Sequence, residues 1–200
     1  MNIHKKGFTL IELIIVIGLI ALLATTVILV INPVKIFQEA RDSQRIADLG
    51  QINSALSLYA ATANLTGVSN PFGATTNCYA FSLPTGITAN CGGRYAANGT
   101  VTTSASQNTN GTGGWIPIDL SKASGGAPIA AWPIDPKPNW NATTNASSTF
   151  YSFASDANNT WEISAKMESG RYSRGGTDDV ENTDGGSKIN VFEVGTNVQL

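Results

Sequence analysis

Residues Gly7–Ile31 read GFTLIELIIVIGLIALLATTVILVI, and this run sets the architecture of the chain. Its 19 residues from Leu13 to Ile31 carry no charge. At about 1.5 Å per residue, such a helix is roughly 28 Å long, enough to cross the hydrocarbon core of a bilayer. Lys5 and Lys6 precede the run, and basic residues favour the cytoplasmic side. We therefore expect a single membrane span with the C-terminal part of the chain outside the cytoplasm.

Glu12 lies near the start of this run, and ordinary membrane targeting does not explain it. An unpaired carboxylate inside a membrane is costly and usually has a function. A secretory signal peptide would end at an A-x-A-like cleavage site, to which Ala21–Ala24 is only a weak match. A plain signal anchor accounts for the apolar run but gives the acid no role.

The segment Lys5–Glu12, KKGFTLIE, resembles the type III signal of bacterial type IV pilins and type II secretion pseudopilins. The resemblance implies that a prepilin peptidase removes leader residues 1–7 by cutting between Gly7 and Phe8. It also implies N-methylation of Phe8 and retention of the apolar helix. An assembly ATPase and an inner-membrane platform protein are the further partners that it implies.

The resemblance also gives Glu12 a role in assembly. In this family the glutamate at this position pairs with the terminal amine of a neighbouring subunit. Glu12 would then pair with the Phe8 amine of the next copy, where charge pairing offsets part of the desolvation cost and fixes one stagger between subunits. The alternative is a glutamate solvated by lipid head groups.

The residue pattern changes after the apolar run 8–31. Asn32-Pro33 predicts a kink or break, because proline inside a helix removes a hydrogen bond. Apolar residues then recur at spacings of three and four, which predicts an amphipathic helix over 32–63 that continues into the head. A soluble coiled coil is disfavoured because the stripe covers too few heptads. The predicted apolar stripe contains Ile36, Phe37, Ala40, Ile46, Leu49, Ile52, Leu56 and Tyr59, and the predicted wet side contains Arg41, Asp42, Arg45 and Asp48.

Residues 64–200 are expected to form a globular head. The segment 64–114 is rich in Gly, Asn, Thr and Ser, which predicts a variable surface loop. Strands are predicted over about 115–200 in WIPIDL, TFYSFAS, TWEISAKM and KINVFEVG, with a turn at Asp156–Asn159. The expected fold is α+β and similar to the type IV pilin lollipop. In it a long N-terminal helix, half transmembrane and half amphipathic, packs on a small antiparallel sheet.

Composition excludes several classes of function. Charged residues make up 13% of the chain, and Arg94 is the only one between Leu49 and Ile118. Nucleic-acid binding needs clustered Lys and Arg, which this pattern lacks. The sole histidine, His4, lies in the leader, so the processed chain has no Ser-His-Asp or Cys-His set and lacks the usual zinc ligands. We predict a protein that is not an enzyme.

Cys78 and Cys91 are the only cysteines. Their spacing fits no metal motif, and a disulfide formed outside the cytoplasm is the simplest interpretation. Such a bridge would stabilise the head by roughly 3 kcal/mol. Two buried free thiols are the alternative.

Two further features near the C-terminus suggest ligands or modification. Asp178, Asp179, Glu181 and Asp184 form an acidic loop whose oxygen ligands suit Ca²⁺, and pseudopilin G heads bind calcium in a comparable loop. A solvated acidic turn is the alternative, and no other cofactor is expected. Asn158 lies in a run that resembles the extended bacterial glycosylation sequon.

These features together predict a structural subunit that polymerises with copies of itself. The long neutral segment 64–114 favours an extracellular type IV pilus serving adhesion, motility or surface interaction. The C-terminal half, including WPIDPKPN at 132–139, resembles pseudopilin G and favours the alternative of a short periplasmic filament for type II secretion. The expected location is the inner membrane for the precursor and the cell surface for the assembled pilus.

Overall fold

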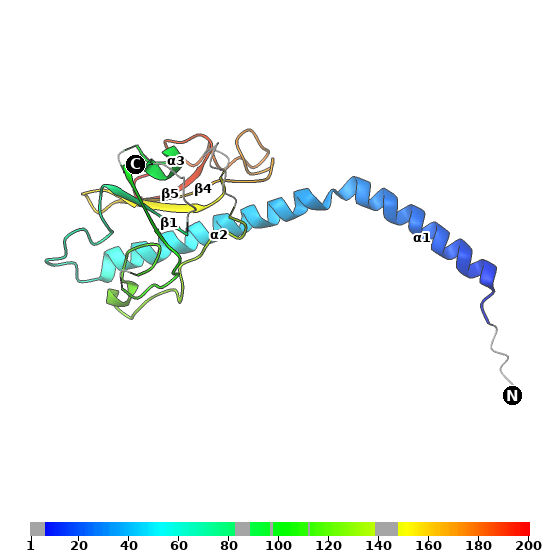
Figure 1. Ribbon diagram of the computed structural model, residues 1–200, viewed down its shortest axis with the longest axis horizontal. Helices are drawn as coiled ribbons and strands as arrows, with labels where there is room; N and C mark the ends of the chain where they lie inside the picture. Colours follow the sequence, from blue (N-terminus) through cyan, green and yellow to red (C-terminus); the bar gives the residue numbers. More distant parts are fainter. Residues whose placement is uncertain (1–6, 83–88, 97, 112, 139–147) are drawn as a thin grey trace, which may run out of the picture. The chain divides into compact units, whose positions relative to one another are not determined.

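The computed structural model describes residues 7–82, 89–96, 98–111, 113–138 and 148–200. The chain divides into two compact units, Met1–Gln38 and Glu39–Leu200, and each is described by itself. Two long helices come first in the chain, and a five-stranded sheet follows them (Figure 1). This order confirms the predicted α+β class.

Helix α1 (Leu10–Ile31) ends at Asn32, which has the left-handed backbone angles φ 44° and ψ 80°. Pro33 is the first residue of α2 (Pro33–Thr62). A proline keeps the residue before it out of the right-handed helical region, and asparagine tolerates the left-handed one. Proline suits the first helical position because the N–H it lacks would have no helical partner there. The predicted break at Asn32-Pro33 is confirmed.

Helix α2 carries the predicted apolar stripe in the part of the helix that belongs to the second unit. Its buried apolar residues are Leu49, Ile52, Ala55, Leu56 and Tyr59. The prediction is wrong at both edges of the stripe. Asp42 and Arg45, predicted on the wet side, are completely buried. Ile36 and Phe37, predicted in the stripe, belong to the first unit and are 50% and 64% exposed.

The sheet has the strand order β2-β1-β3-β4-β5. Its strands are β1 (Asn77–Phe81), β2 (Thr100–Ser104), β3 (Tyr151–Ser155), β4 (Trp161–Ala165) and β5 (Phe192–Gly195). Strands β1 and β2 pair in parallel and the other neighbours pair antiparallel, so the sheet is mixed. The expectation of an antiparallel sheet is wrong at this edge. The chain between β1 and β2 includes the short element α3 (Ala89–Gly93) and is long enough for the crossover that parallel pairing requires.

The sheet also begins earlier than about residue 115, because β1 and β2 lie inside the segment predicted as loop 64–114. The residues WIPIDL, predicted as a strand, form none. Trp115, Ile116 and Ile118 are buried in the main core without belonging to any strand of the sheet. Pro117 also lacks the N–H that a sheet ladder needs. The segment is a loop whose apolar side chains fill the core.

The predicted hairpin of β3 and β4 is confirmed, and so is the predicted strand β5. The turn of the β3–β4 hairpin is the predicted Asp156–Asn159. The carboxylate of Asp156 accepts hydrogen bonds from the backbone N–H groups of Asn158 and Thr160, both at 2.9 Å. Asn159 takes the left-handed conformation with φ 61°, which asparagine tolerates.

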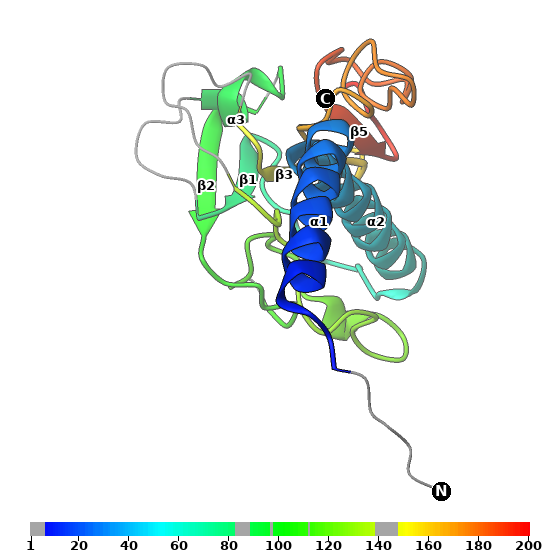
Figure 2. The same cartoon turned by 90° about the vertical axis from the view of Figure 1, so that its right-hand side faces the viewer.

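The main core lies between α2 and one face of the sheet (Figures 1 and 2). Leu49, Ile52 and Leu56 of α2 belong to the same buried cluster as Phe153 and Ile163 of the central strands. The opposite face is buried too, although its residues on β4, Glu162 and Ser164, are polar. A smaller cluster covers that face and contains Cys78, Ala80, Cys91, Tyr95, Phe150 and Ala154.

Candidate processing and assembly site

The predicted cleavage position lies just before α1, in chain without helical structure. Gly7, Phe8 and Thr9 precede the first helical residue, Leu10. The Phe8 side chain is 89% exposed. A peptide bond in extended, exposed chain is open to a peptidase, whereas a bond inside a helix is not.

Thr9 and Glu12 form a complete capping box at the start of α1. The Glu12 backbone N–H donates to Thr9 Oγ1 at 3.2 Å. In return, Glu12 Oε2 accepts from the Thr9 backbone N–H at 3.1 Å and from the Thr9 hydroxyl at 3.0 Å. This arrangement satisfies two N–H groups that the first turn of a helix leaves without partners.

The capping box gives Glu12 a structural role within its own chain, in addition to the predicted pairing between copies. Within one chain, Oε2 already has two donors, and its negative charge lies at the positive end of the helix dipole. The other carboxylate oxygen, Oε1, makes no hydrogen bond among the described residues. Thr9 is not among the site residues predicted from the sequence, although the spacing T-x-x-E is the signature of a capping box.

The apolar surface of α1 is exposed all round. The span Leu10–Ile28 has a mean hydropathy of 2.7 and none of it is buried. Among the described residues it is the only helix long and apolar enough to cross a membrane. Single apolar side chains on a surface are ordinary, but a continuous patch of this size marks a membrane or protein contact.

A buried ion cluster ties α2 to the loops of the second unit. Arg45 bonds both oxygens of Asp135, at 2.8 and 2.7 Å, and also Asp42 at 2.8 Å and Glu168 at 2.6 Å. Burial opposes the charge of Arg45, but these carboxylates outweigh it and raise its pKa. Burial would likewise raise the pKa of Glu168, yet its bonds to Arg41 and Arg45 hold that pKa below the ordinary value. The cluster fixes the helix against two separate segments, one at Asp135 and one at Glu168.

The polar face of the sheet carries two buried glutamates on adjacent strands. Glu162 on β4 pairs in register with Gly195, two residues from Glu193 on β5, so the two side chains lie diagonally on one face. Within the described residues, Oε1 of each glutamate has no hydrogen-bond partner. Burial, reinforced by the nearby Glu193 carboxylate, raises the pKa of Glu162 to about 9. Burial also raises the pKa of Glu193. At neutral pH the pair therefore holds a proton.

Cys78 and Cys91 form the predicted disulfide, with their Cα atoms 6.0 Å apart. The bridge joins β1 to α3, and both cysteines are completely buried. It thereby holds the polar face of the sheet under α3.

The four acidic residues predicted as calcium ligands serve separate local contacts. Asp178 pairs with Arg171 at 2.5 Å, and Asp179 accepts from the Gly175 N–H at 2.7 Å. Glu181 is buried and pairs with Lys166 at 3.1 Å, and Asp184 accepts from the backbone N–H of Glu193 at 2.6 Å. No group of three or more acidic, His or Cys side chains within the described ranges could hold a metal ion. Calcium binding stays a prediction.

Asn158, the predicted glycosylation position, is exposed in the β3–β4 turn. Its side-chain amide donates to Asp156 Oδ2 at 3.1 Å. Glycosylation there also stays a prediction.

Comparison with known proteins identifies the N-terminal segment. Residues 3–28 match the family model described as the prokaryotic N-terminal methylation motif. This motif is the prepilin signal of type IV pilins and pseudopilins, and together with the apolar helix it fits an inner-membrane precursor. No curated protein and no solved structure matches the chain. The match covers Gly7, Phe8, Thr9 and Glu12 and leaves the head unassigned.

Proposed function

We propose that the chain carrying this methylation motif is a type IV pilin, a structural subunit that polymerises into an extracellular pilus. The observation that carries the proposal is the exposed α1. Its apolar surface needs lipid before assembly and copies of the same helix afterwards, and the prepilin signal lies directly before it. The second unit has a buried hydrophobic core of its own.

In the proposed filament, Glu12 sets the stagger between neighbouring helices. Cleavage between Gly7 and Phe8 creates a positively charged α-amino group next to Thr9. In one chain, Thr9 holds Oε2 of Glu12, which leaves Oε1 for the amine of a neighbouring copy. A charge pair in an apolar surrounding is favourable only at contact distance, so other staggers leave an unpaired carboxylate.

The partners follow from the proposed assembly route. A prepilin peptidase would process the precursor in the inner membrane. A platform protein and an assembly ATPase would extract the processed chain into the filament. Within the filament, the partner is the chain itself.

The head favours a filament on the cell surface over the alternative of a short periplasmic pseudopilus. Between Leu49 and Ile118 the only charged residue is Arg94, and Arg94 is buried. The exposed residues described within 64–114 are therefore all uncharged, and most are Thr, Ser, Asn or Gly. A surface of this kind suits exposure on a pilus in the medium.

Mass spectrometry of filaments sheared from intact cells tests this proposal. A peptide beginning at methylated Phe8 should be abundant in the sheared fraction. The same peptide confined to the membrane fraction would keep the processing but assign the chain to a secretion pseudopilus. A chain that retains Met1 in every fraction would refute both.

A further inference from the structure

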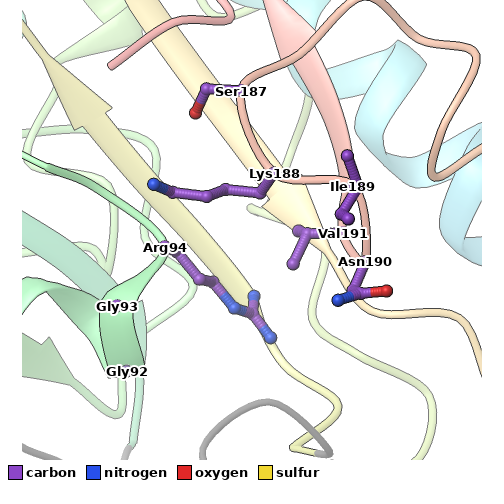
Figure 3. A pocket seen from close by; sticks show the side chains of 8 residues that line it. All are labelled: Gly92, Gly93, Arg94, Ser187, Lys188, Ile189, Asn190 and Val191. Carbon is purple, nitrogen blue, oxygen red and sulfur yellow. The ribbon is translucent and has the colours of Figure 1, made fainter.

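A pocket of about 230 Å³ lies beside the polar face of the sheet in the second unit. One wall is Gly92, Gly93 and Arg94, at and after α3, and the other is the segment 187–191 that precedes β5 (Figure 3). A water molecule takes up about 30 Å³ in the liquid, so the pocket holds a group of only several heavy atoms. It is smaller than the roughly 300 Å³ at which typical ligand pockets begin.

Two cations, Arg94 and Lys188, line this pocket, and neither forms an ion pair within the described residues. The Arg94 guanidinium is buried, and its hydrogen-bond partners among the described residues are neutral: the carbonyl oxygens of Ser148, Phe150 and Ser164, and the Ser152 hydroxyl. Within the described parts of the chain, no ion pair includes Arg94 or Lys188, in contrast to Arg41, Arg45, Lys166 and Arg171. Burial lowers the pKa of Arg94 to about 10, so it remains charged at pH 7.

The backbone beside the cations is strained. Asn90, Cys91 and Gly92 have successive positive φ angles of 67°, 48° and 75°. Glycine adopts this conformation freely, whereas it is uncommon for the other two residues. The disulfide from Cys91 to Cys78 holds the turn in place. Strain retained next to a pocket is typical of binding sites.

The charges of the lining side chains indicate the ligand. Arg94 and Lys188 are the charged residues among those that line the pocket, and both are positive. An anionic group is therefore favoured over a neutral or positive one. The other side of the pocket is partly apolar, with Ile189 and Val191 facing the cavity (Figure 3).

We propose that this pocket binds a carboxylate group between Lys188 and Arg94, with the aliphatic part of the ligand against Ile189 and Val191. The carboxylate comes either from a small free acid or from an acidic side chain of a neighbouring copy. Only the second source rests on the proposed filament.

The first experiment uses the full-length chain in detergent and acetate as the probe. Unfolding is followed by tryptophan fluorescence, since all four tryptophans lie within Glu39–Leu200. Acetate should raise the Tm in a saturable way at matched ionic strength, whereas the neutral analogue acetamide should not. Lys188→Gln should weaken the apparent affinity for acetate at least tenfold. The control Lys122→Gln removes an exposed lysine outside the pocket and should leave it unchanged.

The second experiment distinguishes the source of the carboxylate. Assembled filaments are treated with a carbodiimide, which joins amines to carboxylates in contact, and cross-linked peptides are sequenced. A link from Lys188 to an acidic residue of another copy assigns the site to subunit contact. Acetate binding without this link assigns it to a free acid. Absence of both the saturable acetate effect and the Lys188 link overturns the proposal, and the acetate result does not depend on whether filaments form.

Discussion

Thr9 and Glu12 close a reciprocal set of hydrogen bonds at the first turn of α1, with the Glu12 carboxylate 3.1 Å from the Thr9 backbone nitrogen. The carboxylate on which assembly is proposed to depend is thus oriented by its own chain. This lowers the cost of keeping the acid at the end of an apolar helix, because two donors and the helix dipole already face it.

Replacing Thr9 should weaken assembly without blocking processing. Thr9→Val keeps the shape of the side chain but removes the hydroxyl that accepts from the Glu12 N–H and donates to its carboxylate. Loss of an N-cap costs about 1 kcal/mol, which corresponds to a fewfold loss of correctly oriented Glu12. The yield of sheared filaments should fall severalfold, whereas Thr9→Ser, which retains the hydroxyl, should match the unchanged chain. Equal yields for Val and Ser would show that the capping box has no part in assembly.

Glu12→Ala should leave a processed but poorly assembled subunit. The variant lacks the acid that we propose pairs with the Phe8 amine of the next copy, and it keeps the exposed Gly7–Phe8 bond. Immunoblots should show the processed size in the membrane and little protein in the sheared fraction. Filaments of normal amount and length from this variant would contradict the proposed register role.

Gly7→Leu should block processing. A bulky side chain at the cleavage position prevents the close approach of the peptidase that the methylation motif implies. Only the precursor size should appear on denaturing gels, and the fraction sheared from cells should contain none of the chain. A processed band from Gly7→Leu would place the cleavage elsewhere.

The ion cluster around Arg45 should dominate the stability of the second unit. Asp135→Asn removes a charge from two short bonds to a buried guanidinium. Breaking one member of such a buried cluster costs about 3 kcal/mol, or roughly 6–12 °C in Tm for a unit of this size. Thermal unfolding followed by tryptophan fluorescence measures the loss. Asp178→Asn, which breaks an exposed ion pair with Arg171, is the matched control and should leave the Tm nearly unchanged.

The Glu162–Glu193 pair should make the second unit less stable as pH rises. The pKa of Glu162 is about 9 in the folded chain against an ordinary value of 4.5, so between these values the folded state binds more protons than the unfolded state. The free energy of unfolding therefore falls through this window and levels off above it. Glu162→Gln keeps an acceptor for the Leu200 N–H and cannot ionise.

From pH 5 to pH 8 the stability of this variant relative to the unchanged chain should rise by roughly 4 kcal/mol, at about 1.4 kcal/mol per pH unit inside the window. The Tm measured from pH 5 to pH 9 tests this difference. Parallel curves for the two proteins would show that Glu162 does not titrate in this window.

The sequence predicted what depends on local pattern. The apolar run, the break at Asn32-Pro33, the β3–β4 hairpin and the disulfide are all confirmed, because each follows from neighbouring residues or from a unique pair. Burial of Asp42 and Arg45 could not be predicted from α2, since their partners Asp135 and Glu168 lie about a hundred residues away. The parallel pairing of β1 with β2 also depends on a crossover, and the Thr-rich β2 has little apolar alternation of its own.

The same distinction holds for the candidate site. A contiguous motif predicts the site residues Gly7, Phe8 and Glu12. The spacing of Thr9 to Glu12 in the same motif predicts the capping box. The two cations of the pocket could not be predicted from the sequence. Arg94 and Lys188 are far apart in the chain and line one pocket only once it is folded.

The most direct test of the account is the cryo-EM structure of filaments formed by this chain. We predict that α1 lies in the filament core and that the Glu12 carboxylate lies within hydrogen-bond distance of the Phe8 nitrogen of a neighbouring copy. A filament in which that nitrogen has no carboxylate partner, or in which α1 lies outside the core, would contradict the account.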